Sequence, residues 1–208
     1  GEADVLLVHA PKAEEAFMSQ GYGVNRRLVM HNDFVIVGPP EDPAGIRGLD
    51  SAAAAFQRLA QARARFASRD DDSGTHKKER EIWAQLGIDP GRELSYIETG
   101  QGMGQTLLIA DEKRSYTLSD RATYLAFRLH LDLEVLVEGD PSLRNIYHVM
   151  QVNPQKYPKV NAAGAKAFVD FITSPEIQGL IGSFGVAEYG QPLFVPDAHL
   201  EAGTSAAD

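Results

Sequence analysis

The chain has 208 residues, of which 29 are Asp or Glu and 20 are Lys or Arg, so its formal net charge is −9. This charge argues against a general nucleic-acid-binding protein, which needs a basic face to neutralise phosphates. The absence of cysteine excludes disulfides, thiolate zinc sites and cysteine nucleophiles. Hydrophobic residues make up 43% of the chain, which is typical of a globular protein with a sizeable core.

The first part of the chain alternates strand and helix patterns. Residues 5–8 are a short apolar run typical of a buried strand in a parallel sheet. A helix with proline in its first turn is expected over 11–20, and a strand over 27–37. A proline-rich loop ends that strand, and a strong helix is expected over 48–64.

The same alternation continues to the end of the chain. In order, the patterns predict a strand at 65–68, a helix at 76–86, a strand at 94–98, a helix at 105–112, a helix within 117–129, strands at 133–137 and 145–152, and helices at 162–172 and 175–184. Strands that alternate with helices indicate an α/β protein with largely parallel sheets.

Two proline-containing turns divide the chain. They are Gly38-Pro39-Pro40 and Asp140-Pro141, and they set off a helix-rich middle segment. We therefore expect a middle lobe of residues 38–142, inserted into an outer lobe made of residues 1–37 and 143–208. Because a strand pattern begins almost at the first residue, we expect sequence to be missing upstream and the outer lobe to be incomplete.

The most informative stretch is SRDDDSGTHKKE, residues 68–79, which follows a predicted strand and opens a predicted helix. Ser73, Gly74 and Thr75 are therefore expected to present backbone N–H groups at the positive end of a helix dipole, which is an anion site. Arg69 adds a forked pair of donors. A second interpretation stays open, in which Ser73 only caps the helix and Arg69 pairs with a loop aspartate.

The three consecutive aspartates of this stretch also raise the question of a calcium loop. Counted from Asp70, an EF-hand would place Asp72 third and Glu81 twelfth, but Thr75 stands where the turn requires glycine. One or two of the aspartates are instead expected to orient Arg69. The six histidines show no ligand spacing, so no metal site is expected.

A second glycine-rich turn, GQGMGQ at residues 100–105, also lies between a predicted strand and a predicted helix. Its third glycine comes one residue too early for the dinucleotide fingerprint, which weakens a Rossmann interpretation. Closely spaced glycines let backbone amides approach an anion, so we expect a second anion-contacting turn that faces the first. A tight turn with glycine for packing is the alternative.

Several segments together carry a resemblance to a known family. They are GEADVLLVHAP, GYGVNRRLVMHNDFVIVGPPEDPAGI, SRDDDSGTHKKE, ETGQGMGQTL, YTLSDRATYLAF, NIYHVMQVNP and SPEIQGLIGSFGVAEYGQPLF. The set runs from the first residue to about Pro196 and resembles the tungstate-binding component of bacterial ABC transporters, of the periplasmic-binding-protein type II class.

This resemblance implies two α/β lobes joined by a hinge, which close on tungstate or molybdate without a cofactor or an enzymatic step. It also implies a periplasmic or other extracytoplasmic location, lipid-anchored in Gram-positive bacteria, and permease subunits as partners. The side chains that match oxyanion contacts are those of Arg69 and Thr75, and a backbone contact matches the turn at Met103. The full set of matched residues is Arg69, Ser73, Gly74, Thr75, Met103 and Gly104.

Two departures from the family pattern modify these expectations. The family usually has glycine where this chain has Asp70. It also carries a further segment before the one that matches Gly1, and that segment supplies the other half of the oxyanion shell. Without it, sheet edges are left unpaired. We therefore expect this chain by itself to bind oxyanion weakly, and to pair its edges with another copy of itself or with another chain.

Three other functions are alternatives for this sequence. One is the effector domain of a transcriptional regulator with the same two-lobe fold. Another is a binder of sulfate or phosphate, and phosphate would need an acceptor for its proton, such as Asp70 turned inward. The third, an enzyme, would need an activated nucleophile or a base beside Thr75, and the sequence shows neither.

Overall fold

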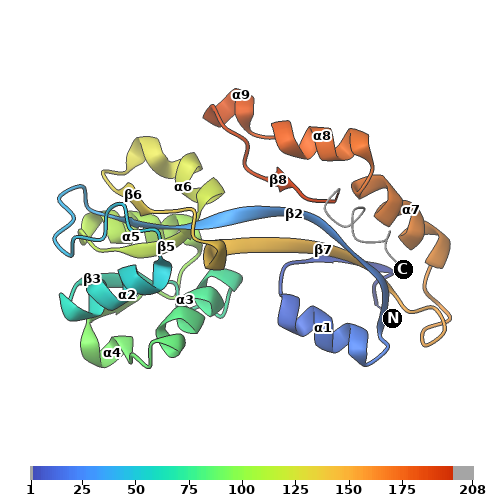
Figure 1. Cartoon of the computed structure of the whole chain (residues 1–208), viewed down its shortest axis with the longest axis horizontal. Helices are drawn as coiled ribbons and strands as arrows, with labels where there is room; N and C mark the ends of the chain where they lie inside the picture. The colour runs from blue at the N-terminus through green and yellow to red at the C-terminus, as the bar shows by residue number, and fades with distance from the viewer. Residues whose placement is uncertain (1, 199–208) are drawn as a thin grey trace, which may run out of the picture. The chain divides into compact units, whose positions relative to one another are not determined.

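The computed structural model describes residues 2–198. The chain divides into two compact units, a first unit of residues 1–32 with 145–208 and a second unit of residues 33–144. Two strands, β2 (Gly23–Gly38) and β7 (Arg144–Val152), carry the chain from one unit into the other (Figure 1). The predicted lobe boundaries, after residues 37 and 142, differ from these crossings by a few residues. Within residues 2–198, no helix combines the length and the apolar character needed to cross a membrane.

The first unit packs helices against an antiparallel set of strands. Strand β1 (Val5–Val8) pairs with β7, from Val5 opposite Gln151 to Val8 opposite His148. Strand β8 (Val195–Pro196) pairs with the part of β2 around Met30. The helices are α1 (Pro11–Ser19), α7 (Ala162–Ile172), α8 (Pro175–Ser183) and α9 (Val186–Tyr189). Val29, Val149 and Val169 form the small buried core.

The second unit contains one end of a six-stranded sheet and a separate two-stranded sheet, and a bridge joins them. The end of β2 pairs antiparallel with β5 (Thr117–Asp120) and β6 (Glu134–Val137), while β3 (Arg65–Ser68) pairs parallel with β4 (Ser95–Glu98). A parallel bridge from Phe66 to Tyr116 connects them. The helices are α2 (Ala52–Gln61), α3 (Gly74–Gln85), α4 (Pro90–Glu93), α5 (Met103–Glu112) and α6 (Arg121–Phe127), with 3-10 turns at Arg128–His130 and Pro141–Leu143.

Two hydrophobic clusters hold the second unit together. In the larger cluster, the rings of Phe56, Phe66 and Trp83 pack with centroids 4.3–5.6 Å apart, which fastens α2 and α3 to β3. The second cluster packs Leu107 of α5 with Val37 of β2, among other residues. Each buried aromatic ring removes about 150–250 Å² from water, so these contacts dominate the stability of the unit. The two clusters also fix the directions of α3, through Trp83, and of α5, through Leu107.

The expectation of largely parallel sheets is wrong. Among the strand pairs whose register is known in residues 2–198, only β3 with β4 is parallel, and the pairs of β1, β5, β6 and β8 are antiparallel. Strand β1 is also only partly buried rather than central. A four-residue apolar run fits either direction, because strand direction depends on the partner and not on the residues of one strand.

Several element boundaries differ from the predicted ones. Strand β2 begins at Gly23 rather than at residue 27, and helix α2 begins at Ala52 rather than at residue 48. Helix α6 lies within the predicted range 117–129, follows β5 and has Asp120 as its cap. Helix α5 begins at Met103, before the predicted start at residue 105. The glycines lowered the expected helicity of that first turn, but packing of Met103 into the core stabilises it.

Candidate functional site

Two loops lie next to each other at the carboxyl ends of the parallel strands β3 and β4. The register places Ser68 opposite Glu98, so the loop that leads to α3 and the loop that leads to α5 start side by side. Each loop ends at the N-terminus of a helix of at least ten residues. Because parallel strands end at the same edge of a sheet, the two positive helix ends are brought to one place.

The first loop brings Arg69 and Thr75 together. The Arg69 guanidinium donates from Nη1 to Thr75 Oγ1 at 3.5 Å, and Thr75 is buried in the first turn of α3. Within the described residues, the buried Nε of Arg69 has no hydrogen-bond partner. An unsatisfied buried donor costs about 1–3 kcal/mol, so an acceptor that reached it would be stabilising.

Asp71 holds the other side of the Arg69 guanidinium. Its Oδ2 accepts from Arg69 Nη2 at 2.5 Å, and its Oδ1 accepts from the Ser73 backbone N–H at 3.1 Å. Burial raises the pKa of Asp71, but hydrogen bonds from Ser73 and Arg69 outweigh burial and lower that pKa overall. A charged Asp71 therefore orients Arg69, as expected for one of the loop aspartates.

Backbone conformation in this loop bears on the expected departure from the family pattern at Asp70. Asp70 has φ of 46° and Asp72 has φ of 57°, both in the left-handed region. Aspartate is one of the few residues other than glycine that adopt this region with little strain. Asp70 thus keeps the loop conformation that glycine would give. Its carboxylate lies 3.7 Å from His76 Nε2.

The capping interpretation of Ser73 is confirmed at the start of α3. Ser73 Oγ accepts from the His76 backbone N–H at 3.3 Å, and Gly74 is the first residue of the helix. The cap uses an oxygen lone pair, and the Ser73 side chain also makes a hydrogen bond that lowers the pKa of Asp71. His76 Nδ1 accepts from the Asp72 backbone N–H at 3.1 Å, which closes the loop.

The second loop ends at a helix without a side-chain cap. Gly102 is the N-cap of α5 and offers no capping oxygen, so the first amides of α5, beginning with Met103, keep their donors for another acceptor. Gly104 has a packing role, because a Cβ there would lie 2.5 Å from the Phe127 ring. Gly100 adopts φ of 60°, which suits a tight turn.

The calcium interpretation of the loop finds no support in the geometry. Asp72 pairs with Lys77 at 3.3 Å and Glu81 pairs with Lys78 at 3.0 Å, so the aspartates and Glu81 do not converge. In the part of the chain that the structure describes, no group of three or more His, Asp or Glu side chains could hold a metal ion.

Comparison with known proteins identifies the family. Residues 1–176 match the family model of the PBP superfamily domain. The protein named "Tungstate-binding protein TupA" from Peptoclostridium acidaminophilum is 46% identical over 200 residues, which cover 95% of this chain and 70% of that protein. The chain belongs to the PBP superfamily, in the family of TupA.

Two further relatives extend this TupA-family assignment. The solved structure titled "Tungstate binding protein - TupA - from Desulfovibrio alaskensis G20" matches with a TM-score of 0.86 and 45% identity, covering 95% of this chain and 80% of that one. A relative from Haloferax volcanii, whose name proposes an anion-binding role in an ABC transporter, is 53% identical over 203 residues. The match covers 95% of this chain but 58% of that relative, so the chain spans little more than half of its length.

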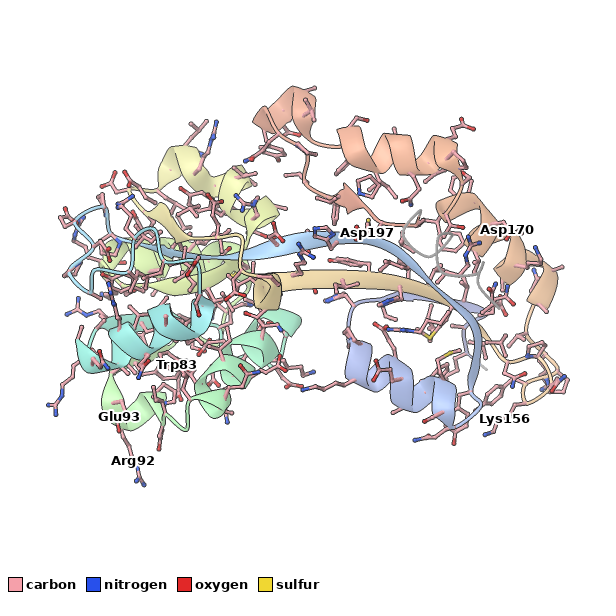
Figure 2. The ribbon with its side chains drawn as sticks, in the orientation of Figure 1. Trp83, Arg92, Glu93, Lys156, Asp170 and Asp197 are labelled. Carbon is pink, nitrogen blue, oxygen red and sulfur yellow. The ribbon has the colours of Figure 1, made fainter. Side chains whose placement is uncertain are left out.

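Glu79 is a residue beside the candidate site that the sequence did not single out. It is buried in α3 and accepts hydrogen bonds from Ser68 Oγ at 2.7 Å, from Trp83 Nε1 at 3.2 Å, and from the Tyr96 hydroxyl. Figure 2 labels Trp83 on the same helix. Through Ser68, whose Oγ also accepts from the Asp70 backbone N–H at 3.3 Å, Glu79 supports the start of the first loop.

Thr99 and Thr106 are two more residues beside the candidate site that the sequence did not single out. Their hydroxyl oxygens lie 2.9 Å apart, at the two ends of the second loop. A threonine in a glycine-rich turn and another inside a helix are unremarkable in sequence. The only available signal was that both fall in the segment that follows β4, where the second loop was already expected.

Proposed function

We propose that this chain binds tungstate, as part of an extracytoplasmic substrate-binding protein that delivers the ion to an ABC permease. Molybdate is the second candidate, because both ions are doubly charged tetrahedra that only accept hydrogen bonds. The names of the relatives from P. acidaminophilum and D. alaskensis support the ligand, and the name of the relative from H. volcanii supports the transporter context. No chemical step is part of the proposal.

The pair of adjacent helix N-termini in the second unit carries the proposal. Arg69 supplies a full positive charge and a fork of donors, and the first turns of α3 and α5 supply partial positive charge. This set consists of donors that need no change of protonation, which suits a fully deprotonated oxyanion. We assign the main contacts to the Arg69 guanidinium, the Thr75 hydroxyl and the Met103 amide, with Ser73, Gly74 and Gly104 in support.

The identity of the ligand can be tested by competition. We expect native mass spectrometry of the 208-residue chain to show one oxyanion adduct with tungstate or molybdate. We also expect an excess of sulfate or phosphate to leave that adduct in place, because sulfate is smaller and phosphate brings a proton that needs an acceptor. Displacement of tungstate by an equal concentration of sulfate or phosphate would contradict the proposed ligand.

The contact from the second loop can be tested by removing a single N–H group. Proline is tolerated at the first position of a helix, and Gly102 (φ −63°, ψ 162°) has the conformation that a residue before proline adopts. Met103→Pro is expected to raise the Kd for tungstate about tenfold more than Met103→Ala, because a hydrogen bond to a charged group contributes about 1.5–3 kcal/mol.

The alanine variant is the matched control for this experiment. Both variants lose the buried methionine side chain, but only Met103→Ala keeps the amide proton. Isothermal titration calorimetry with tungstate measures both affinities under the same conditions. Equal Kd values for the two variants would show that the Met103 amide does not contact the ligand.

A further inference from the structure

We propose that Thr99 and Thr106 are positioning residues, whose linked hydroxyls hold the first turn of α5 against the backbone of Arg69. This inference rests on the proposed function, because Arg69 and the Met103 amide are the donors that the link aligns. Neither hydroxyl is assigned a contact with the ligand. Their role is to keep donors from two different loops at the spacing that one small anion requires.

Thr99 connects the second loop to the first. Its Oγ1 donates to the Ser68 carbonyl at 2.9 Å and lies 3.4 Å from the Arg69 carbonyl. It also accepts from the Gln101 backbone N–H at 3.4 Å, within its own loop. The Thr99 hydroxyl thus contacts the backbone of both loops. Its contacts in the first loop include the backbone of Arg69, whose guanidinium is a proposed ligand contact.

Thr106 connects Thr99 to helix α5. It is fully buried, and its Oγ1 lies 2.9 Å from Thr99 Oγ1 and 3.3 Å from the Gln101 carbonyl. If the Thr106 hydroxyl donates to Thr99 and the Thr99 hydroxyl donates to the Ser68 carbonyl, each hydroxyl proton in this series of hydrogen bonds has an acceptor. Hydrogen bonds in such a chain polarise and strengthen one another in a buried environment.

The ladder between β3 and β4 ends where this link begins. The Thr99 backbone N–H donates to the Ser68 carbonyl at 3.0 Å. Beyond that bond, in the described residues, no backbone hydrogen bond joins residues 69–75 to residues 100–105. Gly100, with φ of 60°, lies immediately after Thr99 and gives the second loop conformational freedom. The hydroxyl link therefore supplies the restraint that the backbone does not.

The affinity test uses variants that change the hydroxyls and little else. Thr99→Val and Thr106→Val replace a hydroxyl by a methyl group of similar size. Each is expected to raise the Kd for tungstate about five- to tenfold, the effect of one net hydrogen bond. The double variant is expected to be no weaker than the weaker single variant, because both changes break the same link. Thr99→Ser is expected to stay within about twofold of the parent chain.

A control variant separates positioning from general stability. Ser115→Ala removes a fully buried hydroxyl that donates to the Ala110 carbonyl at 3.2 Å, at the opposite end of α5. We expect it to lower the free energy of unfolding without changing the Kd. If Thr99→Val and Thr106→Val lower stability but leave the Kd within twofold of the parent, the positioning role is wrong and the link is only structural.

Hydrogen exchange without ligand tests the link independently of the proposed function. We expect Thr106→Val to speed amide exchange in the first loop, residues 69–73, as well as in its own loop, while Ser115→Ala leaves the first loop unchanged. Unchanged exchange over residues 69–73 in Thr106→Val would overturn the link. A parent chain that takes up neither tungstate nor molybdate would instead overturn the proposed function, and the exchange result would still decide the link.

Discussion

Replacing Arg69 by alanine is expected to weaken tungstate binding about 100-fold. The guanidinium contributes charge-assisted hydrogen bonds of about 1.5–3 kcal/mol each, and two of them account for a loss of this size. The variant also leaves the Asp71 carboxylate without its partner, beside the proposed site of a doubly charged anion. Titration calorimetry of the parent and variant chains measures the change in Kd.

Three controls identify the source of that loss. Arg92→Ala removes an exposed arginine of α4, which Figure 2 shows extending away from the second unit, and should leave the Kd unchanged. Arg69→Lys keeps the charge but loses the fork, and should be intermediate. The double variant Arg69→Ala/Asp71→Ala should bind more tightly than Arg69→Ala, because it removes the repulsion. A Kd for Arg69→Ala within threefold of the parent would exclude Arg69 as a ligand contact.

Replacing Glu79 by alanine is expected to lower the free energy of unfolding by about 3–5 kcal/mol. The change leaves the Ser68 hydroxyl, the Trp83 N–H and the Tyr96 hydroxyl without their shared acceptor. Glu79→Gln keeps one acceptor oxygen and should cost about 1–2 kcal/mol. Urea denaturation followed by circular dichroism measures both. A loss below about 1 kcal/mol for Glu79→Ala would mean that these groups find other partners.

The contribution of Glu79 to the free energy of unfolding depends on pH, and the shift in its pKa gives the sign of that dependence. Burial raises the pKa of the Glu79 carboxyl, and hydrogen bonds from Tyr96 and Ser68 offset burial only in part. The folded state therefore binds this proton more tightly than the unfolded chain does. The contribution of Glu79 to stability is largest below the ordinary value of 4.5 and falls as the pH rises through the folded value.

Glu79→Gln supplies the reference for this measurement, because glutamine does not titrate. The unfolding free energy of the parent chain minus that of Glu79→Gln should decrease as the pH rises above the ordinary pKa of 4.5 and through the higher pKa of the folded state. Groups that do not interact with Glu79 contribute equally in both chains and cancel in the difference, whereas its electrostatic interaction with His76 is part of what the difference measures. A difference that grows with pH would show that the hydrogen bonds outweigh burial at Glu79.

Local signals in the sequence predicted both halves of the candidate site. Serine, glycine and threonine in a row after a strand pattern indicated the start of α3, and Ser73 caps that helix. The glycine-rich turn indicated the second loop, although α5 begins earlier than expected. Capping and turn conformation depend on a few neighbouring residues, so a sequence carries this information directly.

The partners of buried polar groups could not be predicted in the same way. Glu79 on α3 accepts a hydrogen bond from Tyr96 on β4, and Thr99 reaches the backbone of Ser68. In the sequence, a glutamate among charged helix residues looks solvated, and a threonine beside glycine looks like part of a turn. Their burial depends on which face of each element meets the core, which is set by the packing of the whole second unit.

The sequence by itself therefore determined the charge balance, the α/β class, the two donor-rich turns and the identity of Arg69 and Thr75 as candidate contacts. Only the tertiary structure decided strand direction, which proved mostly antiparallel, and the parallel pairing of β3 with β4 that places the two turns together. The physical reason is that caps and turns are local, whereas strand pairing joins residues about thirty positions apart, here Ser68 and Glu98.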